Sequence, residues 1–206
     1  CSSLTQIAIP SSVTSIGDYA FNRCSSIKQI TIPSSITSIG SGAFSECKLL
    51  THIDFHSSIT SIPLASFYEC SSLIQITIPS SVTSIGDYAF YGCSSLKQIT
   101  IPPSITSIGE GSFSECSSLE QFMIPSSVTS LGDYAFSKCI SLKQIDIPSS
   151  ITSIGKSSFF DCRSLNQAII PNSVTSIDDF CFYGCSSLAP VSIQPTTSIG
   201  NCSFNQ

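Results

Sequence analysis

The sequence predicts an α/β repeat solenoid in which each coil supplies one parallel strand and one short helical or 3-10 turn. The first observation is a cysteine that recurs every 23 residues, a period typical of solenoids. The second is length: 206 residues are nine such units less one residue, so repeats fill the chain. The cysteines of this column are Cys1, Cys24, Cys47, Cys70, Cys93, Cys116, Cys139, Cys162 and Cys185. We therefore expect one domain, 1–206, of nine coils and, since no polar cap flanks it, a piece of a longer array.

The predicted strand of each coil lies in its first half. In the unit 93–115, Leu96 is followed by Ile99 and Ile101, and the last two are separated by two residues. Residues with this spacing share one face of a strand, so both isoleucines are expected in the core. Pro102 follows directly and has no backbone donor, so it helps to end the strand.

The second half of each coil is expected to return to the core and turn. In coil 70–92, Val82 and Ile85 are followed by Gly86, a turn residue. Asp87 comes next and is the expected N-cap of the short helical turn, as are Asp18 and Asp133. A phenylalanine recurs in that turn and is expected to form a buried ladder. Its members are Phe21, Phe44, Phe67, Phe90, Phe113, Phe136, Phe159 and Phe182. Near-identity of 82–90 with 128–136 adds a 46-residue period, which indicates duplication of a two-coil unit.

Leu-x-x-Ile-x-Ile followed by Ile-Gly-x-x-Ala-Phe-x-x-Cys resembles the leucine-rich repeat, and more narrowly its BspA-like surface-antigen subclass. The resemblance covers all nine units. It departs from the commoner repeat in lacking an asparagine ladder after the strand, where serines such as Ser81 stand. The resemblance implies a right-handed solenoid with its parallel sheet on the concave side. It also implies, by analogy, a cell-surface adhesion or host-interaction protein.

The candidate binding site is the side of the predicted strands that faces away from the core. One column is almost entirely glutamine, and the column two residues later is more variable. The amides form either a solvated or self-bonded ladder that stiffens the sheet, or a recognition strip, and the two interpretations are compatible. The expected partner-binding residues are Gln29, His52, Asp54, Gln75, Gln98, Gln121, Met123, Gln144, Asp146 and Gln167.

Other repeated side chains favour structural roles. His52 and His56 would lie ~13 Å apart on a strand, too far to share one zinc ion, so no metal site is expected.

The cysteine column is expected to be buried and unbridged, because equivalent side chains in stacked coils run parallel. Cys181 and Cys202 lie off this column and are the candidates for a disulfide or a reactive thiol. A threonine in every coil could form an ice-matching array, but local backbone bonding is favoured.

Composition and motifs limit the function. The chain has no catalytic motif and its residues are copied from coil to coil, so we expect neither enzyme activity nor a cofactor. A net charge of -5 with only eight scattered Lys and Arg argues against nucleic acid. No apolar run approaches the ~20 residues of a membrane-spanning helix, so this segment is not expected to insert into a membrane.

We expect a non-enzymatic module that binds a protein, with a host or matrix protein as the candidate partner, at the cell surface or secreted. The alternative is a cytoplasmic scaffold or regulatory subunit that uses the same face, where reduced thiols would be natural. The third hypothesis is that the chain is a purely structural component of a coat. Uncapped end coils predict fraying or end-to-end pairing, and the oligomeric state is otherwise open.

Overall fold

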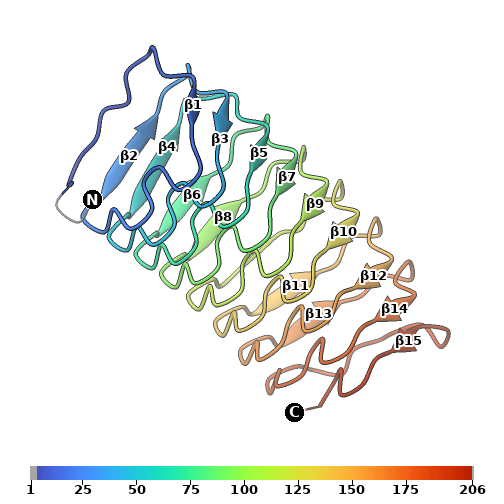
Figure 1. Ribbon diagram of the computed structural model, residues 1–206. Helices are drawn as coiled ribbons and strands as arrows, with labels where there is room; N and C mark the ends of the chain where they lie inside the picture. The colour runs from blue at the N-terminus through green and yellow to red at the C-terminus, as the bar shows by residue number, and fades with distance from the viewer. Residues whose placement is uncertain (1–3, 206) are drawn as a thin grey trace.

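The computed structural model describes residues 4–205; Cys1, the first member of the cysteine column, lies outside them. Successive coils stack side by side into one β-solenoid whose ends lie at opposite ends of the stack (Figure 1). Every paired strand is parallel, and residues 23 apart face each other, as in Ile30 opposite Ile53. The solenoid class and the 23-residue register are therefore confirmed.

Six of the nine coils carry two strands each within residues 4–205, so the prediction of one strand per coil was wrong; in coil 116–138 the first strand is reduced to a single bridge between Gln121 and Gln144. The first strands begin at the glutamine column: β2 (Gln29–Ile32), β4 (His52–Phe55), β6 (Gln75–Thr77), β8 (Gln98–Thr100), β11 (Gln144–Asp146) and β13 (Gln167–Ile169). The second strands are two residues long: β1 (Ser15–Ile16), β3 (Ser38–Ile39), β5 (Ser61–Ile62), β7 (Ser84–Ile85), β9 (Ser107–Ile108), β10 (Ser130–Leu131), β12 (Ser153–Ile154), β14 (Ser176–Ile177) and β15 (Ser198–Ile199). They form narrow sheets along another side of the coils (Figure 1).

The threonine column explains why the second strands form. The Thr106 N–H donates to the Thr83 carbonyl at 2.9 Å, and the Thr106 hydroxyl donates to the same oxygen at 3.2 Å. Thr37, Thr129 and Thr175 repeat the arrangement. The hydroxyls therefore bond backbone, as predicted, although the acceptor lies in the preceding coil and not in a local turn.

The third side of each coil is a run of β-turns, and no helix occurs in residues 4–205, so the predicted helical turns were wrong. Two residues per coil adopt left-handed backbone, for example Tyr88 (φ 53°) and Gly92 (φ 68°). A right-handed helix requires negative φ throughout. The left-handed residues direct N–H groups to the next coil, where Tyr88 bonds the Glu110 carbonyl at 2.7 Å and Gly92 bonds Ser114 at 2.8 Å.

The aspartates expected to cap helical turns instead join neighbouring coils. Asp87 Oδ1 accepts the backbone N–H of Glu110 at 2.8 Å, in the following coil. Asp18 and Asp133 accept the N–H groups of Ser41 and Lys156 in the same way, at 2.7 and 2.8 Å. Because no helix follows these aspartates, the free donor that they satisfy belongs to the next turn of the solenoid.

Replacing Asp87 with alanine is expected to lower the free energy of unfolding by about 1 kcal/mol, since it leaves the Glu110 N–H without its charged acceptor. Urea unfolding measures the loss. The control is Asp54→Ala, an exposed aspartate on β4 for which residues 4–205 supply no hydrogen-bond partner. Equal stability of the two variants would contradict the capping role.

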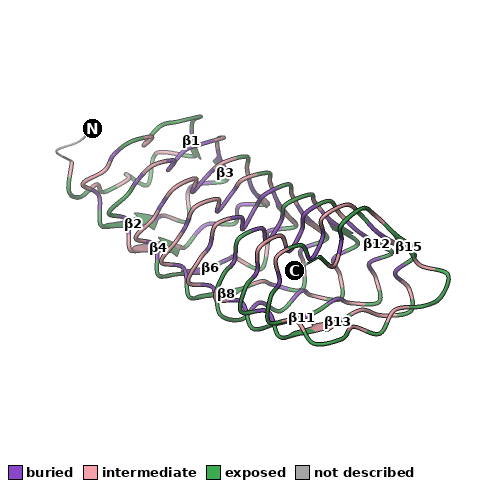
Figure 2. Cartoon of the chain, turned by 90° about the horizontal axis from the view of Figure 1, so that it is seen from below, coloured by how far each residue is buried: buried purple, intermediate pink, exposed green. Residues whose placement is uncertain are grey.

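The core consists of stacked columns of identical side chains. Consecutive phenylalanines from Phe21 to Phe182 stack with ring centroids 5.1–5.5 Å apart and planes within 9°. Beside them, each thiol of the column from Cys47 to Cys185 donates to the carbonyl of the phenylalanine 26 residues earlier, as Cys116 does to Phe90 at 3.2 Å. Figure 2 shows buried residues running through the interior of the stack and exposed residues around its outside. Burial of the cysteine column is confirmed from Cys24 to Cys185.

Candidate functional site

The exposed side of the first-strand sheet is termed the glutamine face and comprises the ten residues predicted to bind a partner. Alternation creates it: on β2, Gln29 and Thr31 point outward and are exposed, whereas Ile30 and Ile32 are buried. Strand register then aligns the glutamines, with Gln75 opposite Gln98 and Gln144 opposite Gln167. Nine of the ten residues are exposed, and the tenth, His52, is half-buried. All ten therefore lie along one face of the solenoid.

The glutamine face is polar with little charge. Asp54 and Asp146 are its carboxylates, and Met123 is the most exposed of its apolar side chains, at 84%. Within residues 4–205 the amides of this column make no side-chain hydrogen bond, which matches the solvated form of the predicted ladder and not the self-bonded one. Their donors and acceptors are therefore available to a partner.

The two histidines are not brought together. His52 lies on β4 with its Nδ1 2.9 Å from the Thr51 hydroxyl, whereas His56 follows the strand and is exposed. Across residues 4–205 no three His, Cys, Asp or Glu side chains are grouped closely enough to hold a metal ion. Cys181 is buried and unbridged, while Cys202 is exposed and unbridged, so the structure joins neither in a disulfide.

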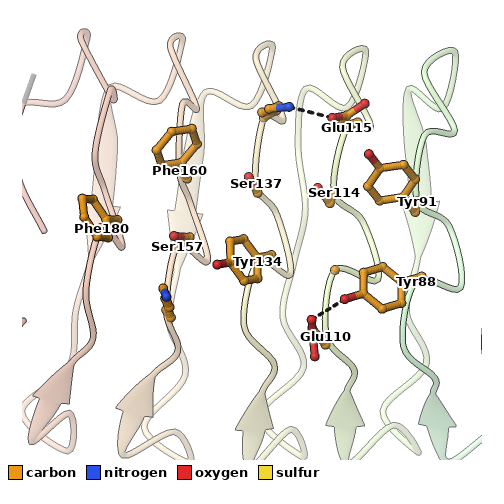
Figure 3. A pocket seen from close by; sticks show the side chains of 13 residues that line it. Tyr88, Tyr91, Glu110, Ser114, Glu115, Tyr134, Ser137, Ser157, Phe160 and Phe180 are labelled. Atoms are coloured by element: carbon orange, nitrogen blue, oxygen red, sulfur yellow. Dashed lines mark hydrogen bonds and ion pairs between the residues drawn. The ribbon is translucent and has the colours of Figure 1, made fainter.

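A second site, which the sequence analysis missed, lies on the side of the β-turns. It is a hollow of about 610 Å³ (Figure 3), termed the aromatic groove. Its lining includes five aromatic rings, two carboxylates and two ammonium groups: Tyr88, Tyr91, Tyr134, Phe160, Phe180, Glu110, Glu115, Lys138 and Lys156. The rings come from two columns with the 23-residue repeat, so coil stacking alone assembles them.

In the first ring column, each aromatic residue before Phe180 is followed one coil later by a small residue. The column reads Tyr19, Gly42, Ala65, Tyr88, Gly111, Tyr134, Ser157 and Phe180. The reason is steric: a Cβ at Gly111 would lie 2.6 Å from Cε1 of Tyr88, so the Tyr88 ring covers the next coil. A ring is therefore followed by a small residue, which accounts physically for much of the 46-residue period.

The second ring column contains two stacks with a gap. It reads Tyr68, Tyr91, Ser114, Ser137, Phe160 and Tyr183. Tyr68 and Tyr91 stack at 4.9 Å, and Phe160 and Tyr183 stack at 5.4 Å. Two serines separate the stacks, and the aromatic groove is the space left above them (Figure 3).

Electrostatics favours the neutral phenols of Tyr88 and Tyr91 and the charged carboxylate of Glu115. The Tyr88 hydroxyl donates to Glu110, and this bond raises the pKa of Tyr88 to about 12. Burial, followed by the nearby charge of Glu115, raises the pKa of Tyr91 to about 12. Lys138 lies 2.8 Å from Glu115, and its hydrogen bond lowers the pKa of that carboxyl. Both tyrosines therefore remain hydrogen-bond donors at neutral pH.

Parallel strands at a 23-residue interval, an apolar Leu and Ile interior and turn segments define a leucine-rich repeat solenoid, a class whose repeats typically mediate protein binding. The chain belongs to the BspA-type family: the profile described as BspA type Leucine rich repeat region (6 copies) matches residues 1–120 and 106–206. This confirms the resemblance seen in the sequence. The family is generally non-enzymatic.

Solved structures of similar proteins agree with the fold. A leucine-rich repeat protein of T. pallidum is 28% identical, with a TM-score of 0.62 over 90% of this chain and 76% of that one. One from Bacteroides ovatus is also 28% identical, with a TM-score of 0.50 over 93% and 69%. The pneumococcal vaccine antigen PcpA shares the fold at 21% identity, with a TM-score of 0.60 over 94% of this chain and 59% of PcpA.

A search of curated proteins finds no match to the chain. In the part of the chain that the structure describes, no helix has the length and apolar character needed to cross a membrane.

Proposed function

We propose that the chain is a binding module displayed at the cell surface or secreted, and that its glutamine face contacts a host or matrix protein. The observation that carries the proposal is the row of solvent-facing amides in register at the strand spacing. A row of equivalent groups gives many weak contacts, and linking them raises avidity without one dominant residue. The description of PcpA as a vaccine antigen supports an exposed location.

The variable column supports partner selection on the same face. Met123 is 84% exposed and Ile169 is 49% exposed, and Asp146 lies opposite Ile169, while Asp54 carries the column's other carboxylate three coils before Met123. Exposed apolar side chains within a polar strip are the usual anchors of a protein interface. The glutamines would thus supply general hydrogen bonding, and this column would supply specificity.

Introducing charge on the glutamine face tests the proposal. The double variant Gln75→Glu/Gln121→Glu places two carboxylates in alternate coils, roughly 10 Å apart, which limits their mutual repulsion. Binding to immobilised collagen and laminin and to cultured epithelial cells is expected to weaken at least about tenfold, because buried charge without a partner is unfavourable.

The matched control is Ser80→Glu/Ser126→Glu, which adds the same charge to the same two coils at exposed turn residues off the face. Thermal melting of both variants checks folding. Equal binding by the two double variants would contradict the role of the glutamine face.

The second candidate function is an intracellular scaffold that uses the same face. It is favoured by the thiols: Cys24 to Cys202 in the described chain are all unbridged, which suits a reducing compartment. Antibody labelling of intact and permeabilised cells separates the two. Labelling of intact cells supports the surface module, whereas labelling only after permeabilisation supports the scaffold.

A further inference from the structure

The aromatic groove lies between the rings of Tyr91 and Phe160. Tyr91 stacks on Tyr68 and Phe160 stacks on Tyr183, so each uses the ring face turned away from the groove. Tyr91 and Phe160 are three coils apart, roughly 15 Å along the stack, with only Ser114 and Ser137 between them in their column. The remaining ring faces therefore border a space long enough for a short linear ligand.

Tyr134 supplies a third ring along the side of the groove. It belongs to the first ring column, in which Tyr19 and Tyr88 each lie over the glycine of the next coil. The corresponding residue for Tyr134 is Ser157, which is only 4% exposed, whereas Tyr134 is 37% exposed. Figure 3 shows Tyr134 beside Ser157, with its ring open to the groove. The ring is thus supported from below and needs little ordering when a ligand binds.

The rims of the groove carry balanced charge. Glu115 is paired with Lys138 at 2.8 Å, and Glu110 accepts the Tyr88 hydroxyl. Lys156 completes a set of two carboxylates and two ammonium groups. A charged ligand would meet one group of its own sign for each group of opposite sign, so the rims favour an uncharged ligand rich in hydrogen-bonding groups.

We propose that the aromatic groove binds a short neutral oligosaccharide. A sugar ring has apolar C–H faces and a rim of hydroxyls; the groove has aromatic faces along its length and charged hydrogen-bonding groups along its rims. Sugar faces lie on Tyr91, Tyr134 and Phe160, and sugar hydroxyls bond Glu115 and Lys138. The volume of about 610 Å³ is in the range of specific ligand sites.

Titration with maltotriose, cellotriose and chitotriose tests the proposal. The chain has no tryptophan, and three of its six tyrosines line the groove, so a change in tyrosine fluorescence reports binding there and calorimetry gives the affinity. At least one trisaccharide is expected to bind, and Tyr134→Ala is expected to weaken it about fivefold to tenfold through loss of a ring face. The matched control is Tyr19→Ala, a 56% exposed tyrosine of the same column outside the groove, which is expected to leave affinity unchanged.

A second variant fills the groove without removing a side chain. Ser137→Tyr places a ring where the same column carries Tyr91 and Phe160 in other coils, so the backbone accepts it. This variant is expected to melt no lower than the parent protein and to lose trisaccharide binding. Failure of all three trisaccharides to bind at millimolar concentration would overturn the proposal. So would binding that survives both Tyr134→Ala and Ser137→Tyr.

Discussion

Steep loss of stability above about pH 9 is the largest effect expected for this protein. Burial raises the pKa of eight thiols, to about 12 for Cys47 and Cys185 and well above the ordinary value for Cys70 and Cys93. The others with raised values are Cys116, Cys139, Cys162 and Cys181. In the unfolded chain these thiols ionise near pH 9, while the folded chain keeps their protons. Unfolding therefore releases protons, and rising pH favours it.

The expected change in the free energy of unfolding with pH is as large as the total stability of a typical domain. Each thiol that ionises only on unfolding lowers the free energy of unfolding by about 1.4 kcal/mol per pH unit above its unfolded pKa. Eight such thiols together give about 11 kcal/mol per pH unit, comparable with the whole stability of a typical domain. We expect constant stability below about pH 8 and cooperative unfolding within roughly one to two units above pH 9.

Urea midpoints between pH 7 and pH 10.5, in the presence of a reductant, measure this effect. The variant Cys93→Ala/Cys116→Ala retains six of the eight thiols and should show a slope lower by about a quarter, whatever its stability at pH 7. Tyr88 and Tyr91, whose pKa values are raised to about 12, act in the same direction but only above about pH 10. A stability that stays flat to pH 10 would contradict burial of the thiols in solution.

Phe113→Ala is expected to lower the free energy of unfolding by ~3–5 kcal/mol. Phe113 is completely buried and stacks between Phe90 at 5.3 Å and Phe136 at 5.5 Å, with Phe122 at 4.8 Å. Truncation leaves a cavity in the middle of the ladder, and the coils on both sides hold it open. Because each coil contacts only its neighbours, the variant is also expected to unfold less cooperatively.

Equilibrium urea unfolding followed by circular dichroism measures the loss at Phe113. The matched control is Phe21→Ala, in the same column but partly exposed and with Phe44 as its only ring neighbour in the described chain. The control is expected to lose clearly less stability. A loss below about 1 kcal/mol for Phe113→Ala would show that the site collapses around the missing ring, contrary to the packing described.

The 23-residue repeat period predicted the solenoid fold, but it did not predict the second strand or the turn conformation of each coil. Ile99, Ile101 and Pro102 carry the pattern of a strand and its end, so the first sheet was predictable. Ser84–Ile85 is too short for any alternation, and its pairing exists only once coils are stacked. The turn segment was misread as helical because left-handed backbone at a residue such as Tyr88 has no local sequence pattern. The columns did contain a clue, since Gly111 shares the column of Tyr88.

The glutamine face could be predicted from a single repeat, whereas the aromatic groove could not. The glutamine face follows from alternation within one strand, which any single repeat displays. The aromatic groove depends on Tyr91 and Phe160 in coils three apart and on Ser114 and Ser137 lacking rings between them. Reading each column down the whole array, and not only the consensus of one repeat, would have exposed that gap.

The ring that covers a small residue in the next coil restricts how such an array can change length. Excising the unit 93–115 would bring the Tyr88 coil against the Tyr134 coil, two bulky phenols in a place that holds one. Excising 93–138 would instead set Tyr88 over Ser157, a tolerated neighbour. Along this stretch, removing two consecutive coils keeps every ring followed by a small residue, whereas removing the small-residue coil 93–115 alone does not.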